Sequence, residues 1–235
     1  MSKKYIISVI PGDGIGKEVI PIALKVLNKL SIKFGFVFEF KLFKYSCDYY
    51  IRNGVMMDKD GLKKLEDCHA ILLGSVGMPS VADHISLWGL LIPIRRAFDQ
   101  YVNLRPVKSL KGIDSVLRDK KNIDYLIVRE NTEGEYSDIG GIENKNQPDE
   151  FVFQKAIFSK KGTERIVNYA YELAAKRKNK LTSATKSNGI IHSMTYWDNI
   201  VDSISKKYPN VTTSRYHIDI LSAQIIKNPD WFGVI

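Results

Sequence analysis

The sequence has few cysteines and no long apolar run. Only Cys47 and Cys68 occur among its 235 residues, so neither a disulfide framework nor a paired-cysteine metal motif can be built. No stretch reaches the roughly 18 uncharged apolar residues that a membrane helix needs. The apolar run at 6–10 stops at Pro11-Gly12 and is too short for a signal peptide. These absences favour a protein of the reducing cytoplasm with no membrane partner.

Acidic residues are outnumbered, with 26 Asp and Glu against 35 Lys and Arg, which gives a net charge of +9. The field of such a protein favours anions, whether nucleic acid, phosphorylated cofactors or small carboxylates. The basic tract at 176–180 follows an expected helix and contains no aromatic residue, so a solvated helix end is favoured there over a nucleic-acid patch. Because the basic residues are dispersed, nucleic-acid binding is the least favoured hypothesis, and retention on heparin or DNA would test it.

Apolar periodicity predicts alternating strands and helices in the first hundred residues. The expected strands are 5–10, 37–43 and a buried strand at 70–74, and the expected helices are 17–30, 60–65 and 87–98. Such alternation indicates a parallel or mixed sheet covered by helices.

From residue 101 onward the expected strands follow one another more directly, which marks a second domain. The expected strands are 103–110, 123–130, 151–159, 181–185 and 211–218, and the expected helices are 162–176 and 190–207. The polar segment 137–150 is a mobile loop or an excursion between strands. At 228–235 a turn leads into the first residues of a buried strand.

Three glycines follow the first strand, at Gly12, Gly14 and Gly16. Glycines in such a turn let backbone amides approach an anion at a helix N-terminus, but a tight turn without a ligand is an equal alternative. Lys17 and Glu18 depart from both common phosphate-binding patterns. A dinucleotide fingerprint needs glycine where this chain has Lys17, and a P-loop needs serine or threonine where it has Glu18.

Arginines recur at Arg95, Arg105 and Arg129, and the last is followed by a stretch containing Tyr136. A guanidinium donates two parallel hydrogen bonds to a carboxylate, so three arginines that converge would hold a dicarboxylate. Spacing leaves the convergence open, and each arginine singly is also typical of a solvated or ion-paired surface residue.

Polar residues also lie where strands should end. Lys186 and Asn188 lie at an expected junction between strand and helix, a favoured place for ligand-binding groups. A buried Lys186 suits a general base, whereas an exposed Lys186 beside a capping Ser187 is equally compatible with the residues. Asp219 is expected to share a strand face with His217 and is a candidate ligand for a hard cation, although one carboxylate does not make a site. The other histidines, at 69, 84 and 192, have no partner spacing and are interpreted as structural.

Taken together, these segments resemble the metal-dependent β-decarboxylating dehydrogenases, the family of isopropylmalate, isocitrate and tartrate or D-malate dehydrogenases. The matching strings occur in family order: VIPGDGIGKEV at 9–19, LLGSVGMP at 72–79, IRRAFDQYVNLRPVKSL at 94–110, VRENTEGEYS at 128–137, TSATKSNGI at 182–190 and YHIDILSAQ at 216–224. The forms DHISLWG, VRENTEGEYS and HIDILSA look closest to the tartrate and D-malate branch.

The resemblance implies an α/β, isopropylmalate dehydrogenase-like fold, with mixed parallel and antiparallel strands in two domains. Residues 1–100 would be the cofactor-side first domain, and 101–235 would carry the substrate site and the dimer interface. Family members continue past the position of Ile235 with two more metal aspartates and an adenosine loop. We therefore expect the first domain to be incomplete, the chain to be the N-terminal part of such an enzyme, and the isolated chain to be inactive.

The resemblance also implies roles for individual residues. Those that bind the substrate carboxylates would be Arg95, Arg105 and Arg129. Tyr136 would be the general acid and Lys186 the general base. Asp219 would be a ligand of Mg²⁺ or Mn²⁺. The residues along the NAD cofactor would be Gly14, Ile15, Ser75, Val76 and Asn188.

Family members are homodimers with shared active sites, in which the lysine and the metal aspartate reach the neighbouring subunit and a clasp at 137–158 pairs between subunits. The implied substrate is a malate-type hydroxy diacid, D-malate or tartrate. Leu90 and Leu91 permit a small or apolar substituent on the substrate but do not distinguish between these diacids. NAD is expected over NADP only because the chain resembles the tartrate and D-malate branch. An alternative is a non-catalytic partner subunit that assembles with a full-length homologue.

Overall fold

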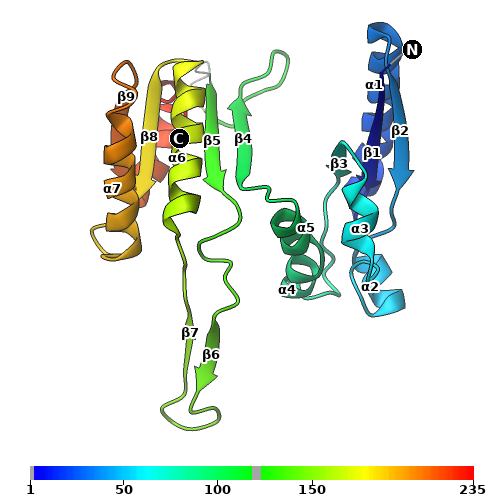
Figure 1. Ribbon diagram of the computed structural model, residues 1–235, viewed down its shortest axis with the longest axis horizontal. Coiled ribbons are helices and arrows are strands. Elements are labelled where there is room, and N and C mark those ends of the chain that lie inside the picture. Colours follow the sequence, from blue (N-terminus) through cyan, green and yellow to red (C-terminus); the bar gives the residue numbers. More distant parts are fainter. Residues whose placement is uncertain (1–2, 118–122) are drawn as a thin grey trace. The chain divides into compact units, whose positions relative to one another are not determined.

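The computed structural model describes residues 3–117 and 123–235 (Figure 1). Two compact units divide between Asp99 and Gln100. Each unit is described separately below.

The first unit is built on a parallel sheet of three strands in the order β2-β1-β3. β1 spans Lys4–Ile10, β2 spans Val37–Leu42 and β3 spans Ala70–Leu73. The helix α1, Gly16–Phe34, connects β1 to β2 and places Ile20 against the sheet. It ends at Gly35, whose φ of 73° is the left-handed conformation that glycine adopts without a steric cost.

Four short helical segments complete this unit: α2 (Cys47–Asn53), α3 (Gly61–Glu66), α4 (Asp83–Ser86) and α5 (Ile92–Ala97). A π-helical segment, Leu87–Leu91, joins the last two, so the expected helix at 87–98 is present but begins earlier. α2 is absent from the sequence expectations. The prediction of a buried strand at 70–74 is wrong in its burial, because β3 lies at the sheet edge with Ala70 and Leu73 exposed.

The second unit contains a mixed sheet in which the C-terminal residues are an inner strand. β4 (Val102–Lys108) and β5 (Asp124–Glu130) are antiparallel, and β8 (Lys180–Thr185) and β9 (Thr212–His217) are parallel. Val234 bridges Leu126 of β5 and Leu181 of β8 in parallel. Residues 233–235 therefore lie between β5 and β8, as the expected buried strand at the end of the sequence requires.

Helices cover both faces of this sheet. One face packs against α6 (Lys160–Ala175) and α7 (Ser193–Ser205), around the fully buried Tyr171 and Val234. The opposite face packs against α8 (Ile218–Lys227), whose Leu221 contacts Tyr125 and Phe232. A short 3₁₀ segment, Pro229–Trp231, leads into the inner strand.

An antiparallel hairpin projects from the second unit (Figure 1). Its strands are β6 (Gly140–Glu143) and β7 (Phe151–Gln154), and every residue of both is exposed. We call residues 137–158 the arm. The polar segment 137–150 is thus not only a loop, since it contains β6. The expected strand at 151–159 is shortened to β7.

The sequence prediction of a mixed α/β fold is confirmed by the parallel and antiparallel pairings. One local prediction is wrong. The strand expected at 211–218 ends at His217, and the chain turns there into α8, whose first turn contains Asp219. His217 and Asp219 therefore do not share a strand face.

Candidate active site

Strand direction gathers several predicted site residues at one edge of the second unit. Residues 233–235 run parallel to both β5 and β8, and β8 is parallel to β9, so these strands end at the same edge. Arg129 lies one residue before the end of β5, Lys186 follows β8, and Asp219 follows β9. The carboxyl edge of parallel strands is where α/β proteins bind ligands.

The register of the β4–β5 ladder brings two of the three arginines together. Arg105 pairs with Ile127, and Arg129 lies two residues further along β5. Because side chains alternate along a strand, Arg105 and Arg129 point to the same face as diagonal neighbours. The Arg129 guanidinium lies 5.4 Å from the centre of the Tyr136 ring, and Tyr136 is 39% exposed.

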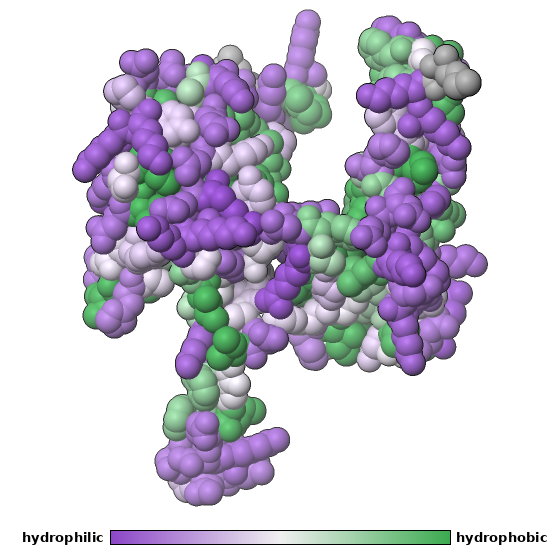
Figure 2. Space-filling view, viewed as in Figure 1, coloured by the Kyte–Doolittle hydropathy of each residue, from purple (hydrophilic) through white to green (hydrophobic). Residues whose placement is uncertain are grey.

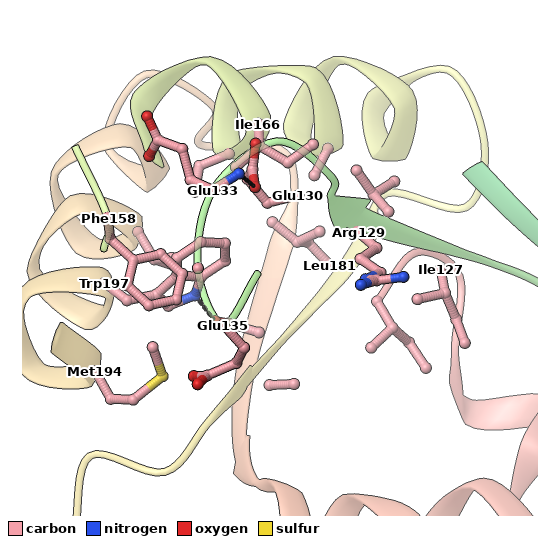
Figure 3. A pocket seen from close by; sticks show the side chains of 18 of the residues that line it. Ile127, Arg129, Glu130, Glu133, Glu135, Phe158, Ile166, Leu181, Met194 and Trp197 are labelled. Atoms are coloured by element: carbon pink, nitrogen blue, oxygen red, sulfur yellow. Dashed lines mark hydrogen bonds between the residues drawn. The ribbon is translucent and has the colours of Figure 1, made fainter. Parts of the chain in front are cut away.

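These three side chains border a cavity of about 490 Å³ (Figure 3). Most of its remaining wall is apolar, including Phe158, Ile166 and Trp197. The Trp197 indole N–H donates to Ser183 Oγ, which fixes the indole over β8. Arg129 and Ile127 lie at one end of the view in Figure 3, and Met194, Phe158 and Trp197 lie at the other.

Lys186 and Asp219 are in direct contact, with Lys186 Nζ donating to Asp219 Oδ2. Their side chains are 35% and 58% exposed, so the pair is reachable from solvent. Thr185 Oγ1 accepts from the backbone N–H of Ser187 and shapes the turn that carries Lys186. Asn188 lies exposed in the same turn.

The residues described do not by themselves form a metal site. Among 3–117 and 123–235 there is no group of three His, Cys, Asp or Glu side chains placed to hold an ion. Asp219 provides one carboxylate, and Lys186 occupies it. Mg²⁺ or Mn²⁺ needs several oxygen ligands, so Asp219 supplies at most one of the set.

Arg95 belongs to the first unit, where it lies half-buried on α5. Its neighbour Leu90 is fully buried in the core cluster of that unit, and Leu91 is half-buried. The burial of Leu90 assigns this residue to packing.

The glycine turn is explained largely by packing. A Cβ on Gly12 would lie 2.0 Å from the Ser75 carbonyl oxygen, and one on Gly16 would lie 2.1 Å from that of Pro11. Gly74 meets the same Pro11 oxygen at 2.0 Å. Three glycines thus let the turn and the loop after β3 touch through their backbones.

Asp13 holds this assembly together, although the sequence analysis did not single it out. Its carboxylate is 1% exposed and accepts from the N–H groups of Cys47 (2.9 Å), Asp48 (3.3 Å) and Gly77 (3.2 Å). Burial opposes ionisation, but these hydrogen bonds outweigh it and lower the pKa of Asp13. The sequence feature that indicates such a role is an acidic residue between two glycines of a turn.

The first-turn amides of α1 do not face a vacant anion position. The N–H of Gly16 bonds Asp13 O and Ser75 Oγ, that of Lys17 bonds Gly14 O, and that of Glu18 bonds Ile15 O. The structure therefore favours the tight-turn interpretation over phosphate binding by these amides. At the turn itself, Gly14 and Ile15 remain exposed, and so does Ser75 on the adjoining loop, where Val76 is half-buried.

Two cations of the basic tract are engaged by the sheet. Arg177 donates to Asp124 Oδ1 at 2.7 Å, and Lys178 Nζ donates to the Asp124 carbonyl at 2.6 Å. These contacts support a structural role at the helix end.

No helix in the described part of the chain has the length and apolarity needed to cross a membrane.

A mixed sheet with basic and acidic groups at the carboxyl edge of its parallel strands is typical of an α/β protein that binds a ligand at that edge. Residues 6–235 match the family model of the isocitrate/isopropylmalate dehydrogenases. The chain belongs to this family.

Its relatives place it near one branch of that family. The chain is 48% identical over 234 residues to the tartrate dehydrogenase/decarboxylase of Pseudomonas putida, covering 97% of this chain and 64% of the relative. It is 47% identical over 240 residues to the decarboxylating D-malate dehydrogenase of Escherichia coli strain K12, covering 100% and 66%. The crystal structure of isocitrate dehydrogenase from Methylococcus capsulatus superposes with a TM-score of 0.84 at 25% identity, covering 98% and 65%. The chain thus spans about 65% of the length of these proteins.

Proposed function

We propose that this chain carries the substrate and proton-transfer groups of a metal- and NAD-dependent oxidative decarboxylation of a malate-type hydroxy diacid, D-malate or tartrate. The observation that carries the proposal is the placement of Arg129, Lys186 and Asp219 at one sheet edge. The similarity to a tartrate dehydrogenase/decarboxylase and a D-malate dehydrogenase supports this substrate class.

Arg105 and Arg129, which share one face of the β4–β5 ladder, bind the carboxylates. A carboxylate accepts two parallel hydrogen bonds from each planar fork, which orients the diacid as well as attracting it. The Tyr136 ring lies beside the Arg129 guanidinium, which supports a position of its hydroxyl near the bound substrate.

Lys186 and Tyr136 handle the two protons. Lys186 Nζ accepts the proton of the C2 hydroxyl, directly or through a water. NAD, when bound, would supply the acceptor for the hydride that leaves C2. The resulting ketone weakens the bond to the adjacent carboxylate, which leaves as carbon dioxide. Tyr136 then donates a proton to the carbon that held it, and the product is a 2-keto acid.

In the first unit the cofactor would lie along Gly14, Ile15, Ser75 and Val76, most of which are exposed. In the second unit the exposed Asn188 is a separate candidate for the cofactor. For the metal, Asp219 would supply one oxygen ligand after releasing Lys186. Because the described residues contain no group of three His, Cys, Asp or Glu side chains placed to hold an ion, we expect the 235 residues alone to form little or no NADH. Robust NADH formation by this chain from either diacid with Mn²⁺ would contradict that expectation.

The arm is proposed as the clasp of a homodimer that shares its active sites. It exposes apolar side chains along its length, among them Ile142 (49%), Phe151 (54%) and Val152 (70%). Figure 2 shows hydrophobic surface along the stalk of the arm and a hydrophilic tip. Apolar surface of this kind, bounded by polar residues, is typical of a protein interface.

Substrate binding tests the proposal without requiring turnover. Calorimetric titration of the chain with D-malate and with tartrate should show saturable binding, and Arg129→Gln should weaken it by roughly tenfold or more, since hydrogen bonds to charged groups contribute about 1.5–3 kcal/mol. Arg177→Gln is the matched control, because Arg177 binds Asp124 at the opposite end of β5. Failure of both diacids to bind, or equal losses in the two variants, would contradict the proposal.

A second candidate function is a non-catalytic partner subunit. The exposed Lys186–Asp219 pair and the exposed arm favour it, because both are available to a second chain. Co-purification with a full-length homologue would support this role, and a monodisperse lone species beside that homologue would count against it.

A further inference from the structure

The segment that carries Tyr136 is hydrogen-bonded to the last residues of the arm. Gly134 N–H donates to Ile157 C=O at 2.7 Å, and Ile157 N–H donates back to Gly134 C=O at 3.3 Å. Three residues further along, Ser137 Oγ donates to Lys155 C=O. Tyr136 therefore lies between two points at which its segment is bound to the end of the arm.

One side chain of the arm spans this interval. Gln154, the last residue of β7, donates from Nε2 to Glu135 C=O at 2.8 Å and to Ser137 C=O at 3.0 Å. These are the carbonyl groups of the residues on either side of Tyr136. A glutamine amide has two N–H donors on one nitrogen, so a single side chain satisfies both acceptors.

The hairpin leaves room for Gln154 to reach these carbonyls. Gly140 is the partner of Gln154 across the β6–β7 ladder, and side chains at paired positions lie on the same face of a sheet. A Cβ on Gly140 would lie 3.4 Å from Gln154 Cβ and 2.4 Å from the Phe153 carbonyl oxygen. A glycine at position 140 therefore keeps the space beside Gln154 open.

Hydrogen bonds to these two carbonyls restrict the backbone at Tyr136. The Glu135 carbonyl belongs to the planar peptide unit that ends at the Tyr136 nitrogen. The Ser137 carbonyl belongs to the peptide unit two further along, so the backbone between them is held at both ends. The Tyr136 ring, whose centre lies 5.4 Å from the Arg129 guanidinium, is thereby kept at the wall of the cavity that both residues line.

We propose that Gln154 is a positioning residue for Tyr136, and that its amide keeps the phenol beside Arg129 at the wall of the 490 Å³ cavity. In the described part of the chain, this wall includes Glu135 and Tyr136 but not Gln154. Gln154 therefore acts through Tyr136 rather than by touching a ligand. The inference rests on the proposed function of Tyr136 as the proton donor, but the placement of the ring is measured separately from that function.

A simpler role for Gln154 would be to stabilise the hairpin alone. The pairing of Gln154 with Gly140 is a backbone pairing, however, and does not need the side-chain amide. Both carbonyls that accept from the amide lie outside β6 and β7, on the segment that leads into the arm. The contact therefore couples the arm to the segment of Tyr136.

Fluorine NMR of the full chain tests the placement, with 3-fluorotyrosine incorporated at position 136 only. Gln154→Glu keeps the shape of the side chain but replaces its donors with an acceptor, so it should shift or split the fluorine resonance. Gln154→Lys returns a donor to this position and should bring the resonance back toward that of the unsubstituted chain. Gln147→Glu makes the same change at the exposed tip of the arm and should leave the resonance unchanged.

Hydrogen exchange separates this role from a purely structural one. Gln154 is exposed, so the added charge stays in solvent, and all variants should keep slow amide exchange in α6. An unchanged fluorine resonance in Gln154→Glu would overturn the proposal, whether or not the amides of β6 and β7 exchange faster. Equal shifts in Gln154→Glu and Gln147→Glu would also contradict it, because a charge anywhere on the arm would then suffice.

Substrate adds a readout that depends on the function. Saturating D-malate or tartrate should move the fluorine resonance of the unsubstituted chain, and Gln154→Glu should reduce that movement at least twofold. The dissociation constant from calorimetry should change by less than about twofold, because Arg105 and Arg129 still bind the carboxylates. A large loss of affinity with an unchanged movement would overturn the positioning role. If neither diacid moves the resonance in the unsubstituted chain, the proposed function of Tyr136 fails, and the ligand-free spectra still decide the role of Gln154.

Discussion

Asp13 carries a buried charge in the first unit. Three backbone N–H groups from α2 and from the loop after β3 converge on its buried carboxylate. Asp13→Asn places an amide N–H where an oxygen accepts, so at least one donor loses its partner. We expect a loss of about 2–3 kcal/mol in the free energy of unfolding at neutral pH, measured with urea.

The same contact predicts a pH dependence. Because the pKa of Asp13 is lowered in the folded state, its stabilisation is fully present above the unfolded pKa of about 3.9 and is lost as the pH falls through the folded value. The difference in stability between wild type and Asp13→Asn should therefore shrink below about pH 4. A difference that grows in acid would contradict this assignment.

Cys47 should be chemically silent in the folded protein. Burial and the neighbouring Asp13 carboxylate raise the pKa of its thiol to about 11, and its side chain is fully buried. Thiolate is the reactive form, so a thiol reagent at neutral pH should modify Cys68 first and Cys47 only on unfolding. Labelling of native Cys68→Ser at the rate of an unfolded control would show that Cys47 is accessible.

At the scale of elements, two glycines of the turn after β1 are required for different reasons, one for packing and the other for its backbone conformation. Gly12 and Gly14 both have positive φ, at 72° and 47°, but only Gly12 has a neighbour in the way of a Cβ. Gly12→Ala should cost several kcal/mol, and Gly14→Ala only about 1 kcal/mol. Thermal unfolding of both variants measures this ranking, and equal losses would contradict it.

The arm makes the oligomeric state testable. Val152→Asp introduces a charge at the most exposed large apolar side chain of β7, and an unpaired charge buried between subunits is costly. We expect at least a tenfold rise in the dimer dissociation constant by analytical ultracentrifugation, which corresponds to about 1.4 kcal/mol. Lys145→Asp at the polar tip is the control. Unchanged dimerisation in Val152→Asp would exclude the arm as the clasp.

For the whole molecule, periodicity in the sequence predicted most strands and long helices, because each has an apolar face with a regular spacing. It did not predict α2, a helix of seven residues. The Ser46 hydroxyl caps the N-terminus of this helix by accepting a hydrogen bond from Tyr49 N–H. Nor did it predict α8, since the apolar residues after His217 continue the preceding strand pattern. Short elements are decided by caps and tertiary contacts rather than by period.

The site was predictable in composition but not in arrangement. The position of Lys186 at a strand end followed from the sequence, because the change of period marks that end. The stacking of Arg129 beside Tyr136 and the contact of Lys186 with Asp219 depend on strand register and on where α8 begins. These long-range features have no signature in local spacing.

Central to the proposed function is that the arginine, lysine and tyrosine side chains of this chain bind a hydroxy diacid and transfer its protons during oxidative decarboxylation. The most direct test is a chimera in which residues 1–235 of this chain replace the aligned part of the D-malate dehydrogenase of Escherichia coli. NADH formation and carbon dioxide release from D-malate and tartrate are measured with Mn²⁺. We predict turnover by the chimera and a loss of roughly 10²–10⁴-fold in kcat for Tyr136→Phe and Lys186→Ala. A folded, dimeric chimera that turns over neither diacid, or variants that keep full kcat, would contradict the account.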